Sequence, residues 1–367
     1  MARMDAVSKR TVGKIEKLAE SVLKSVKGRE NPFVEIPVRS LANVHFDKKK
    51  GLVQLGKQRQ KRYFFNVAMA KKFMQTFLVS DACKELVESG KTTSIRDLYY
   101  ITKHTIGETK QNTFEEQDES DPIIEDIEVA LDALREELHL FASRKGTMVG
   151  PITIRDSGDT IDLRRMGSGG WAVPSIVEEN IVQFGKHEAK YILLIEKDAV
   201  WKRFNEDKFW QREKCVIVTG QGQPPRGVRR MVQRLSTELK LPVYVLVDND
   251  PWGFYIYSVL KQGSINLAYE SMRMAVPGAR FVGLSSFDKT KFKLPSNVSI
   301  PMNDQDSSRA KQMLAYPWFE AARWQKEIQE MVDSGEKYEL EALSRRGISF
   351  ITEEYLPKKL RDRDWLE

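Results

Sequence analysis

The chain has 367 residues, of which 41% are hydrophobic and 30% are charged, and its formal net charge is +7. This length predicts two or three domains, and the composition is that of a soluble globular protein. No run of eighteen apolar residues occurs, and the amino-terminal segment is Lys-rich and periodic rather than a signal sequence, so we expect a cytoplasmic protein without a membrane anchor. The two cysteines, Cys83 and Cys215, stand in apolar contexts. They are expected to fill the core, which argues against disulfides and zinc sites.

Charge is distributed unevenly along the chain. Residues 1–70 hold 16 Lys and Arg against 6 Asp and Glu, whereas residues 108–137 hold 2 against 12. A basic stretch favours binding to a phosphate polymer through counterion release, and an acidic stretch repels one. Solvated helix faces would give the same pattern, so charge alone favours nucleic acid as a partner without requiring it.

Residues 1–65 are predicted to form an extension ahead of the main domains. Apolar residues at helical spacing predict an amphipathic helix over residues 5–28. Short strands are expected at 33–38 and 52–55, with a Lys-rich turn at 47–51 between them. The apolar stripe of the helix packs on the chain itself or contacts another protein, and the sequence leaves both readings open.

Residues 66–145 are predicted to form a helical module. Three short helices followed by an extended element resemble a winged-helix domain, which places a helix in or near a DNA groove. The expected elements, in chain order, are helices at 67–79, 82–89 and 93–103, an acidic loop at 108–122 and a helix at 123–141.

The third helix of this module carries the first chemical feature. Ser94 and Asp97 have the spacing of a capping box, so the helix is expected to begin near residue 94. Arg96 and Tyr100 are then one turn apart on the same face, whereas Tyr99 projects about 100° away and is expected to pack inward. A tyrosine phenol is a poor nucleophile unless a cation stabilises the phenolate or the phosphate it attacks, and a guanidinium one turn away can do so. A Tyr-Tyr pair alone is nevertheless a weak signal.

Residues 146–367 are predicted to form an α/β domain with helices at its carboxyl end. Short apolar runs alternate with helical patterns, which implies a mostly parallel sheet with its sites at the carboxyl ends of the strands. The tail, residues 307–360, is expected to hold two or three helices anchored by Trp318, Phe319, Trp324 and Leu340, without chemistry of its own. The expected elements are strands at 152–154 and 160–163, a helix at 175–184, a strand ending at Glu196, a helix at 198–204, a strand at 215–218, a helix at 227–239, a strand ending at Asp248, a helix at 253–262 and a strand at 280–284.

Two of these strands end in carboxylates. The run Tyr191 to Ile195 leads into Glu196, and the run Val243 to Val247 leads into Asp248-Asn-Asp250. Because parallel strands bring their carboxyl ends to the same edge, we expect the three acids to converge there. A single acid at a strand end is usually a cap or a turn former, but three hard oxygen ligands at one edge favour a magnesium site.

Together these features resemble the A subunits of archaeal topoisomerase VI, a family whose eukaryotic relatives make the double-strand breaks of meiosis. The resemblance covers nearly the whole chain and implies a winged-helix (CAP-like) domain over residues 66–145, followed by a Toprim α/β domain with carboxyl-terminal helices over residues 146–367. The motifs that carry it are Arg96-Asp-Leu-Tyr-Tyr100, Ile195-Glu196-Lys197-Asp-Ala, Thr219-Gly-x-Gly222 and Asp248-x-Asp250-Pro-x-Gly253.

The resemblance also implies a mechanism. Tyr100 would attack DNA and form a 5′-phosphotyrosyl link, with Arg96 steadying the phosphate. Glu196, Asp248 and Asp250 would hold Mg²⁺, and Glu196 would assist proton transfer to the 3′ oxygen. The resemblance further implies a homodimer that acts on double-stranded DNA, with Tyr100 of one protomer working beside the metal of the other. It joins a separate ATPase B subunit in an A₂B₂ heterotetramer, and no Walker motif for ATP is found in this chain.

One departure and three other hypotheses stand beside this reading. Gln223-Pro-Pro-Arg226 follows the Gly-x-Gly loop where an aromatic residue is expected. A Toprim nuclease that uses water would also need the acids, but would leave Arg96 and Tyr100 without a role. A winged-helix DNA-binding protein with a structural acidic site, and a recombination initiator that breaks DNA without rejoining it, are the other two.

Overall fold

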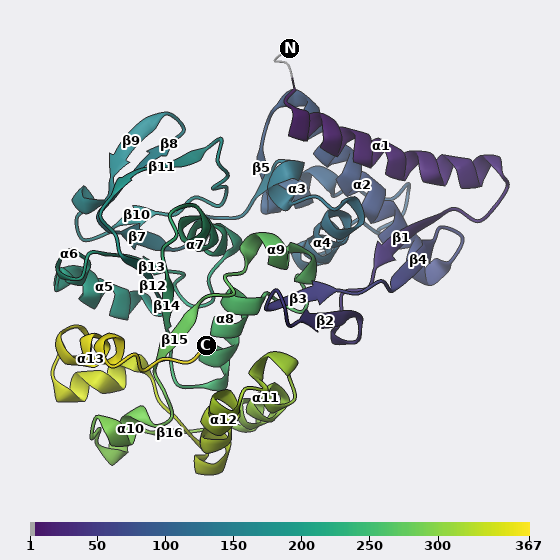
Figure 1. Cartoon of the computed structure of the whole chain (residues 1–367). Helices are drawn as coiled ribbons and strands as arrows, with labels where there is room; N and C mark the ends of the chain where they lie inside the picture. Colours follow the sequence, from purple (N-terminus) through teal and green to yellow (C-terminus); the bar gives the residue numbers. More distant parts are fainter. Residues whose placement is uncertain (1–3) are drawn as a thin grey trace. The chain divides into compact units, whose positions relative to one another are not determined.

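The computed structural model describes residues 4–367, which have a mixed α/β fold (Figure 1). The chain divides into two compact units. The first unit runs up to His45 and continues over residues 54–143 and 265–270, and the second holds residues 46–53, 144–264 and 271–367. Among the described residues, no helix combines the length and the apolar character that crossing a bilayer requires.

The first unit is mainly helical. Its long helix α1 (Ala6–Lys27) begins at Asp5, whose carboxylate accepts a hydrogen bond from the Ser8 amide, and is followed by Gly28. Strand β1 (Phe33–Pro37) pairs antiparallel with β4 (Arg59–Tyr63), and β5 (Thr93–Ser94) pairs parallel with β6 (Leu140–Phe141). The remaining helices of the unit are α2 (Val67–Ser89), α3 (Ile95–Thr102) and α4 (Ser120–Leu131). Strands β2 (Val44–Asp47) and β3 (Leu52–Leu55) form a further two-stranded sheet. The helix and the strands expected before residue 66 are therefore confirmed.

Two predicted helix boundaries in the first unit are wrong. The helices expected at 67–79 and 82–89 are one continuous helix, α2, because Val79, Cys83 and Val87 lie on one buried face and hold it together across the expected break. The helix expected at 123–141 ends at Leu131, where Asp132 adopts a left-handed conformation with φ of 44°. After it the chain forms a short 3₁₀ turn and β6.

The second unit is built on a six-stranded sheet with the strand order β10-β7-β13-β12-β14-β15. The four strands at one side of this order run parallel: β13 (Cys215–Thr219), β12 (Tyr191–Ile195), β14 (Val243–Leu246) and β15 (Arg280–Gly283). Strand β7 (Thr147–Val149) pairs antiparallel with β13, and β10 (Trp171–Ala172) pairs antiparallel with β7. The helices that follow the strands are α5 (Asp198–Glu206), α6 (Phe209–Arg212), α7 (Arg226–Glu238), α8 (Pro251–Gln262) and α9 (Ser271–Met274).

Strand β12 is apolar along its whole length because both faces of the sheet are covered (Figure 1). Leu193 and Ile195 pack in a cluster with Trp201 and Phe204 of α5, and α7 also packs against β12. All five residues of β12 are buried. The fully buried strand predicted from the sequence is confirmed.

A separate three-stranded sheet precedes β12, and it corrects one prediction. Strands β8 (Ile152–Asp156), β9 (Asp159–Asp162) and β11 (Val182–His187) are antiparallel. The helix expected at 175–184 is wrong, because Val182 to Phe184 pair with β8 instead. Arg234 of α7 donates to the carbonyls of Val177 and Val182, which draws those oxygens away from a helical pattern.

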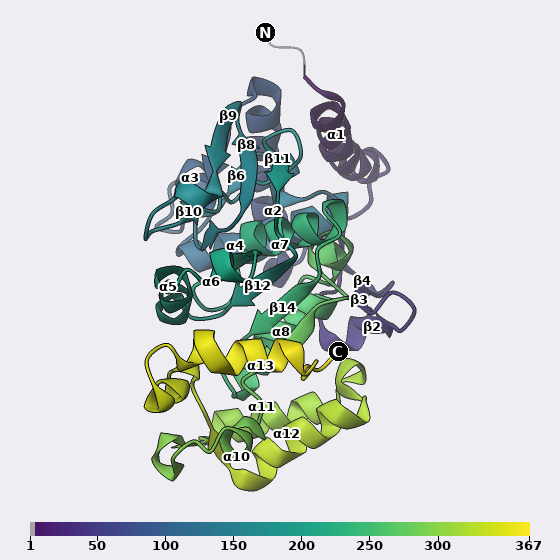
Figure 2. The ribbon, with the colours of Figure 1, turned by 60° about the vertical axis from the view of Figure 1, so that its left-hand side comes forward.

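The carboxyl-terminal part packs back on the sheet. Leu366 exchanges two hydrogen bonds of 2.9 Å with Phe281 of β15, so the end of the chain covers part of this edge strand. Trp324 is buried against the rings of Phe254, Tyr257 and Phe281, as expected for a packing anchor. The elements of this part are α10 (Asp288–Lys291), β16 (Ile300–Pro301), α11 (Asp304–Leu314), α12 (Ala322–Ser334), β17 (Glu336–Lys337) and α13 (Leu356–Arg361); α11 and α12 lie side by side (Figure 2).

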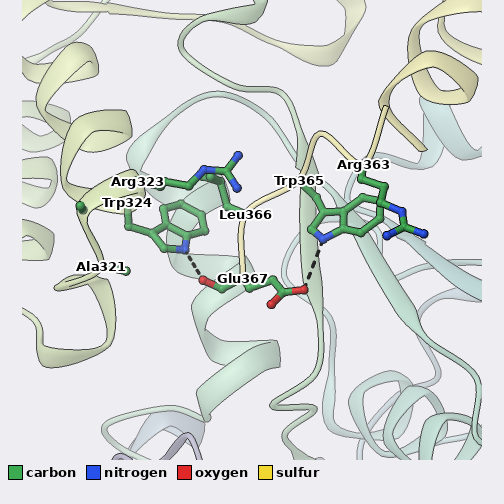
Figure 3. Close-up of a pocket in the computed structure, with 8 residues that line it drawn as sticks. Ala321, Arg323, Trp324, Arg363, Trp365, Leu366 and Glu367 are labelled. Atoms are coloured by element: carbon green, nitrogen blue, oxygen red, sulfur yellow. Dashed lines mark hydrogen bonds between the residues drawn. The ribbon is translucent and has the colours of Figure 1, made fainter. Parts of the chain in front are cut away.

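A cavity of about 480 Å³ lies beside this chain end (Figure 3). The Trp324 indole N–H donates to the Glu367 carbonyl oxygen at 3.0 Å, and the Trp365 indole donates to the Glu367 carboxylate at 3.3 Å. Arg323 and Arg363 also line the cavity. The contacts of Glu367 fix the last residues against α12.

Close packing at the end of β7 gives a stability test. A Cβ on Gly150 would lie 2.8 Å from the Cα of Val216 and 2.9 Å from the carbonyl oxygen of Cys215, in backbone that cannot move aside. We expect Gly150→Ala to lower the free energy of unfolding by about 1–3 kcal/mol, measured by thermal or urea unfolding. Gly278→Ala, where nothing lies within 4 Å of the added carbon, is the matched control. Equal stability of the two variants would contradict the packing described for β7 and β13.

Candidate functional site

Glu196 and Asp248 lie together at the carboxyl edge of the sheet. They follow the neighbouring parallel strands β12 and β14, whose register pairs Ile195 with Leu246. The Glu196 amide donates to the Leu246 carbonyl at 3.0 Å, and the Asp248 amide donates to the Glu196 carboxylate at 3.0 Å. The strand pairing therefore brings two acids that are 52 residues apart in sequence to one point.

Burial strongly perturbs both carboxyl groups. Burial, reinforced by the charge of Asp248, raises the pKa of Glu196 to about 7. Burial also raises the pKa of Asp248 to about 6, although the Leu340 amide and Lys197 oppose the rise. Such a shift means that the folded chain holds the charged form of each acid at a cost in free energy. A positive group brought to this edge would lower that cost.

Lys197 supplies positive charge at the same place. Its ammonium lies 3.0 Å from Asp248 Oδ2, 3.2 Å from Glu339 and 2.7 Å from Glu341. Burial alone would lower the pKa of Lys197, but these carboxylates together raise it. The ammonium is thus held as a cation among three acids.

The tail contributes to this site, contrary to the prediction that it carries no chemistry. The Leu340 amide donates to Asp248 Oδ1 at 2.8 Å, and the flanking Glu339 and Glu341 hold Lys197. Glu339 precedes a 3₁₀ helix that begins at Leu340, so the two acids flank the start of that helix. No signal in the sequence indicated this role, because nothing in it placed residues 339–341 near β14.

Asp250 has a second, structural role. It is the N-cap of α8, and its Oδ1 accepts a hydrogen bond of 2.6 Å from the Gly253 amide. Burial raises its pKa as well. The charge of Asp306 reinforces that rise, and Asp306 itself accepts from the Trp252 indole and pairs with Lys337 at 2.7 Å. The cap thus engages Oδ1 of this carboxylate.

The loop 219–222 closes over the backbone of Glu196. The Gly222 amide donates to the Glu196 carbonyl at 2.9 Å, and the Thr219 hydroxyl donates to the same oxygen at 3.2 Å. Gln221, between the two glycines, has a φ of +56°. The loop thus holds the end of β12 in place and contributes no carboxylate.

The acids fit a divalent cation by chemistry, although their present arrangement is not a finished metal site. Within residues 4–367, no three His, Cys, Asp or Glu side chains are close enough together to hold an ion. The donors at the edge are nevertheless hard carboxylate oxygens, which Mg²⁺ prefers. The Lys197 ammonium already lies against Asp248 as a stand-in for positive charge. A cation held by Glu196, Asp248 and Asp250 would require this ammonium to move off Asp248.

A second group of candidate residues lies on α3, in the first unit. Ser94 caps the helix by accepting from the Asp97 amide at 3.0 Å, as the sequence predicted. Tyr99 is buried, donates to the Glu115 carbonyl at 2.9 Å and accepts from Lys103. Its phenol is therefore occupied by the packing of the unit.

Tyr100 has the opposite environment. Its side chain is 60% exposed, and within residues 4–367 its hydroxyl makes no hydrogen bond. Arg96, one turn earlier, is also exposed and unpaired among the described residues. Tyr100 contacts the ring of Tyr99 edge to face, with centroids 5.0 Å apart. The predicted difference between an inward Tyr99 and an outward Tyr100 is therefore confirmed, whereas their roles stay a prediction.

Three family models match successive parts of the chain. A model described as "Type IIB DNA topoisomerase" matches residues 71–140, and one described as "All-beta domain in DNA topoisomerase VI alpha subunit" matches residues 145–188. The third, the Toprim domain shared by topoisomerase 6 A subunits and Spo11, matches residues 191–360. The third match contains the buried acids described above, and the first contains α3.

Whole-chain relatives agree with these matches. The A subunit of type 2 DNA topoisomerase 6 from Pyrococcus horikoshii is 44% identical over 359 residues, which cover 95% of this chain and 93% of the relative. The protein of the same name from Hyperthermus butylicus is 41% identical over 96% of this chain and 94% of its own. The A3 subunit of DNA topoisomerase 6 from Oryza sativa subsp. indica is 34% identical over 99% of this chain and 80% of its own.

The raised pKa of Glu196 predicts a pH-dependent stability change. Because the folded pKa lies near 7, above the ordinary value of 4.5, the cost of the buried charge is absent at low pH, grows as the pH rises between these values and is complete above 7. Without metal and in EDTA, Glu196→Gln should therefore stabilise the chain at pH 8 by roughly 1–3 kcal/mol and change it little at pH 4.5. Thermal unfolding at the two pH values measures this.

The control for this test is Glu206→Gln, which removes an exposed carboxylate of α5 in the same unit. It should leave stability nearly unchanged at both pH values. A loss of stability in Glu196→Gln at pH 8 would mean that the carboxylate is a net stabilising group, contrary to the burial and charge repulsion described for it.

Proposed function

Since the chain belongs to the family of topoisomerase 6 A subunits, and is thus part of a type II DNA topoisomerase, we propose that Tyr100 carries its cleavage chemistry. Membership of this family indicates that the chain is the cleavage subunit of a type IIB topoisomerase. In the proposed reaction this subunit makes a transient double-strand break in DNA and rejoins it. The observation that carries the assignment to Tyr100 is its exposed, unbonded hydroxyl, one turn from an exposed guanidinium.

The proposed step is a transesterification at phosphorus. The Tyr100 oxygen forms a bond to the phosphorus while the bond from phosphorus to the 3′ oxygen breaks, which leaves a 5′-phosphotyrosyl link and a 3′ hydroxyl. The phenolic proton passes to solvent water as the bond forms, because Tyr100 is exposed, and the 3′ oxygen takes up a proton. Arg96 would donate to the phosphate oxygens and offset their charge. Rejoining is the same reaction in reverse, so no energy source is needed for the breakage itself.

The buried acids would serve the 3′ side of this reaction. Glu196, Asp248 and Asp250 would hold Mg²⁺, which when bound would neutralise charge on the scissile phosphate and the leaving oxygen. We also propose that Glu196 assists proton transfer to the 3′ oxygen.

The proposed assembly contains more than this chain. The designation of its relatives as A subunits implies DNA binding together with a separate B subunit. We propose a homodimer in which Tyr100 of one protomer acts beside the acids of the other, joined to two ATPase B subunits as A₂B₂. ATP hydrolysis in the B subunits would drive the passage of one DNA duplex through the break in another. The proposed outcome is the relaxation of supercoils and the decatenation of DNA in the cytoplasm. Residues 1–65 would contact a partner, residues 66–145 would form the winged-helix domain, and residues 146–367 the Toprim domain with its helices.

Covalent trapping tests the role of Tyr100. The chain is incubated with its B subunit, Mg²⁺, nucleotide and supercoiled plasmid, then denatured, and protein attached to 5′ DNA ends is measured. We expect Tyr100→Phe to lower the linkage by about a thousandfold or more, since no other group replaces the nucleophile. Tyr99→Phe is the matched control, and it should keep the linkage while losing about 1 kcal/mol of stability with its hydrogen bonds. DNA cut without attached protein, in Tyr100→Phe as well, would instead establish a nuclease that uses water.

The same assay tests the acids. Asp248→Asn keeps an acceptor for the Leu340 amide but removes a charge, and we expect it to lower covalent linkage roughly a hundredfold. EDTA should abolish linkage in the unmodified chain, and added Mg²⁺ should restore it. Asp198→Asn, at the start of α5 next to Lys202, removes an acid outside the proposed ligand set and should have little effect. Linkage that survives both EDTA and Asp248→Asn would contradict the metal role.

A further inference from the structure

Lys197 forms ion pairs with three carboxylates at the carboxyl edge of the sheet. Its ammonium bridges three carboxylates that come from two distant segments: Asp248 after β14, and Glu339 and Glu341 after β17. The three distances, 2.7 to 3.2 Å, all lie within ion-pair range. One cation therefore serves as the counter-charge for an acid of the proposed metal site and for two acids outside it.

The three acids differ in their access to water. The Asp248 side chain is 7% exposed, whereas those of Glu339 and Glu341 are 54% and 46% exposed. The ion pair with Asp248 is thus the buried end of the bridge, where a charge without a partner is costly. The two glutamates form its solvent end, where an ion pair is screened and can be rearranged at little cost. An ammonium on a flexible four-carbon stem can shift between these ends.

We infer that Lys197 is a built-in counter-cation that neutralises Asp248 in the metal-free chain and moves onto Glu339 and Glu341 when a divalent cation binds. This inference rests on the metal role proposed above. An ammonium and a dication repel each other strongly at one carboxylate, so one must leave when the other arrives. The glutamates give the displaced ammonium two acceptors without moving it far.

The segment 339–341 contacts both partners of this ion pair, Asp248 and Lys197. The Leu340 amide holds Asp248 Oδ1 at 2.8 Å, while the side chains on either side hold Lys197. Asp248 would therefore keep its orientation through Oδ1 when Lys197 leaves Oδ2. Lys197 would in this way set how tightly the site binds Mg²⁺.

A titration of the 367-residue chain with Mg²⁺, without DNA or nucleotide, tests the inference. The readout is the Mg²⁺ concentration that gives half of the maximal rise in melting temperature. We expect Lys197→Met to melt at a lower temperature in EDTA and to bind Mg²⁺ roughly tenfold more tightly, because a competing positive charge is gone. Lys197→Arg, which keeps the charge, should restore a midpoint near that of the unmodified chain. Lys202→Met, an equal charge change at an exposed site of α5, should not shift it.

The role of the glutamates is tested by a double-mutant cycle. With Lys197 present, Glu339→Gln combined with Glu341→Gln should weaken Mg²⁺ binding several-fold, because the displaced ammonium then has no charged acceptor. In the Lys197→Met background the same pair of changes should have little effect. Should Lys197→Met fail to fold, Lys197→Gln takes its place in the cycle, because it also removes the charge. An unchanged midpoint in the double glutamine variant overturns the exchange by itself.

Other outcomes would overturn the inference. A midpoint in Lys197→Met that is unchanged or weaker would make the ion pair a structural one. Equal weakening by the glutamine pair in both backgrounds would mean that the glutamates attract the metal directly. If the unmodified chain shows no Mg²⁺ dependence at all, the metal part of the proposed function fails with the inference, while the trapping result for Tyr100 stands separately.

Discussion

The second unit withdraws two carboxylates, Glu196 and Asp248, from water at the ends of neighbouring strands, and this is the constraint around which its site is built. Pairing between β12 and β14 sets the backbone of Glu196 beside that of Asp248, and the Asp248 amide donates to the Glu196 carboxylate. Nearby donors stabilise the charged carboxylates. The Asp248 amide donates to Glu196, and the Leu340 amide and the Lys197 ammonium contact Asp248. The segment after β17 returns to the edge of the sheet and supplies some of these contacts. It brings the Leu340 amide to Asp248, and Glu339 and Glu341 to Lys197.

The sequence was informative where the chemistry is local. Apolar runs ending in acids indicated β12 and β14, and the spacing of Ser94 and Asp97 indicated the start of α3. The separation of an inward Tyr99 from an outward Tyr100 followed from helical geometry alone. Each of these features is decided within one turn or one strand, so the residues themselves carry the signal.

The sequence failed where distant residues decide the outcome. The segment 175–184 carries a helical pattern, but Arg234, 52 residues after Val182, holds its carbonyls and β8 pairs with its end. The pattern around Asp81 predicts a helix break, yet the core face of α2 continues past it. The segment that holds Lys197 lies about 92 residues from Asp248, and no periodicity connects the two. Such contacts depend on the topology of the folded sheet, which a local pattern does not contain.

The cap formed by Asp250 affects how substitutions at this position are interpreted. One of its oxygens begins α8 by binding the Gly253 amide, so an alanine there removes an acid and leaves the first turn of a helix without its cap in one change. An inactive alanine variant would confound charge with architecture. Asparagine retains the oxygen that caps the turn while removing the charge, and serine retains a shorter cap. Comparing these variants separates what the residue contributes as a charge from what it contributes as the starting point of a helix.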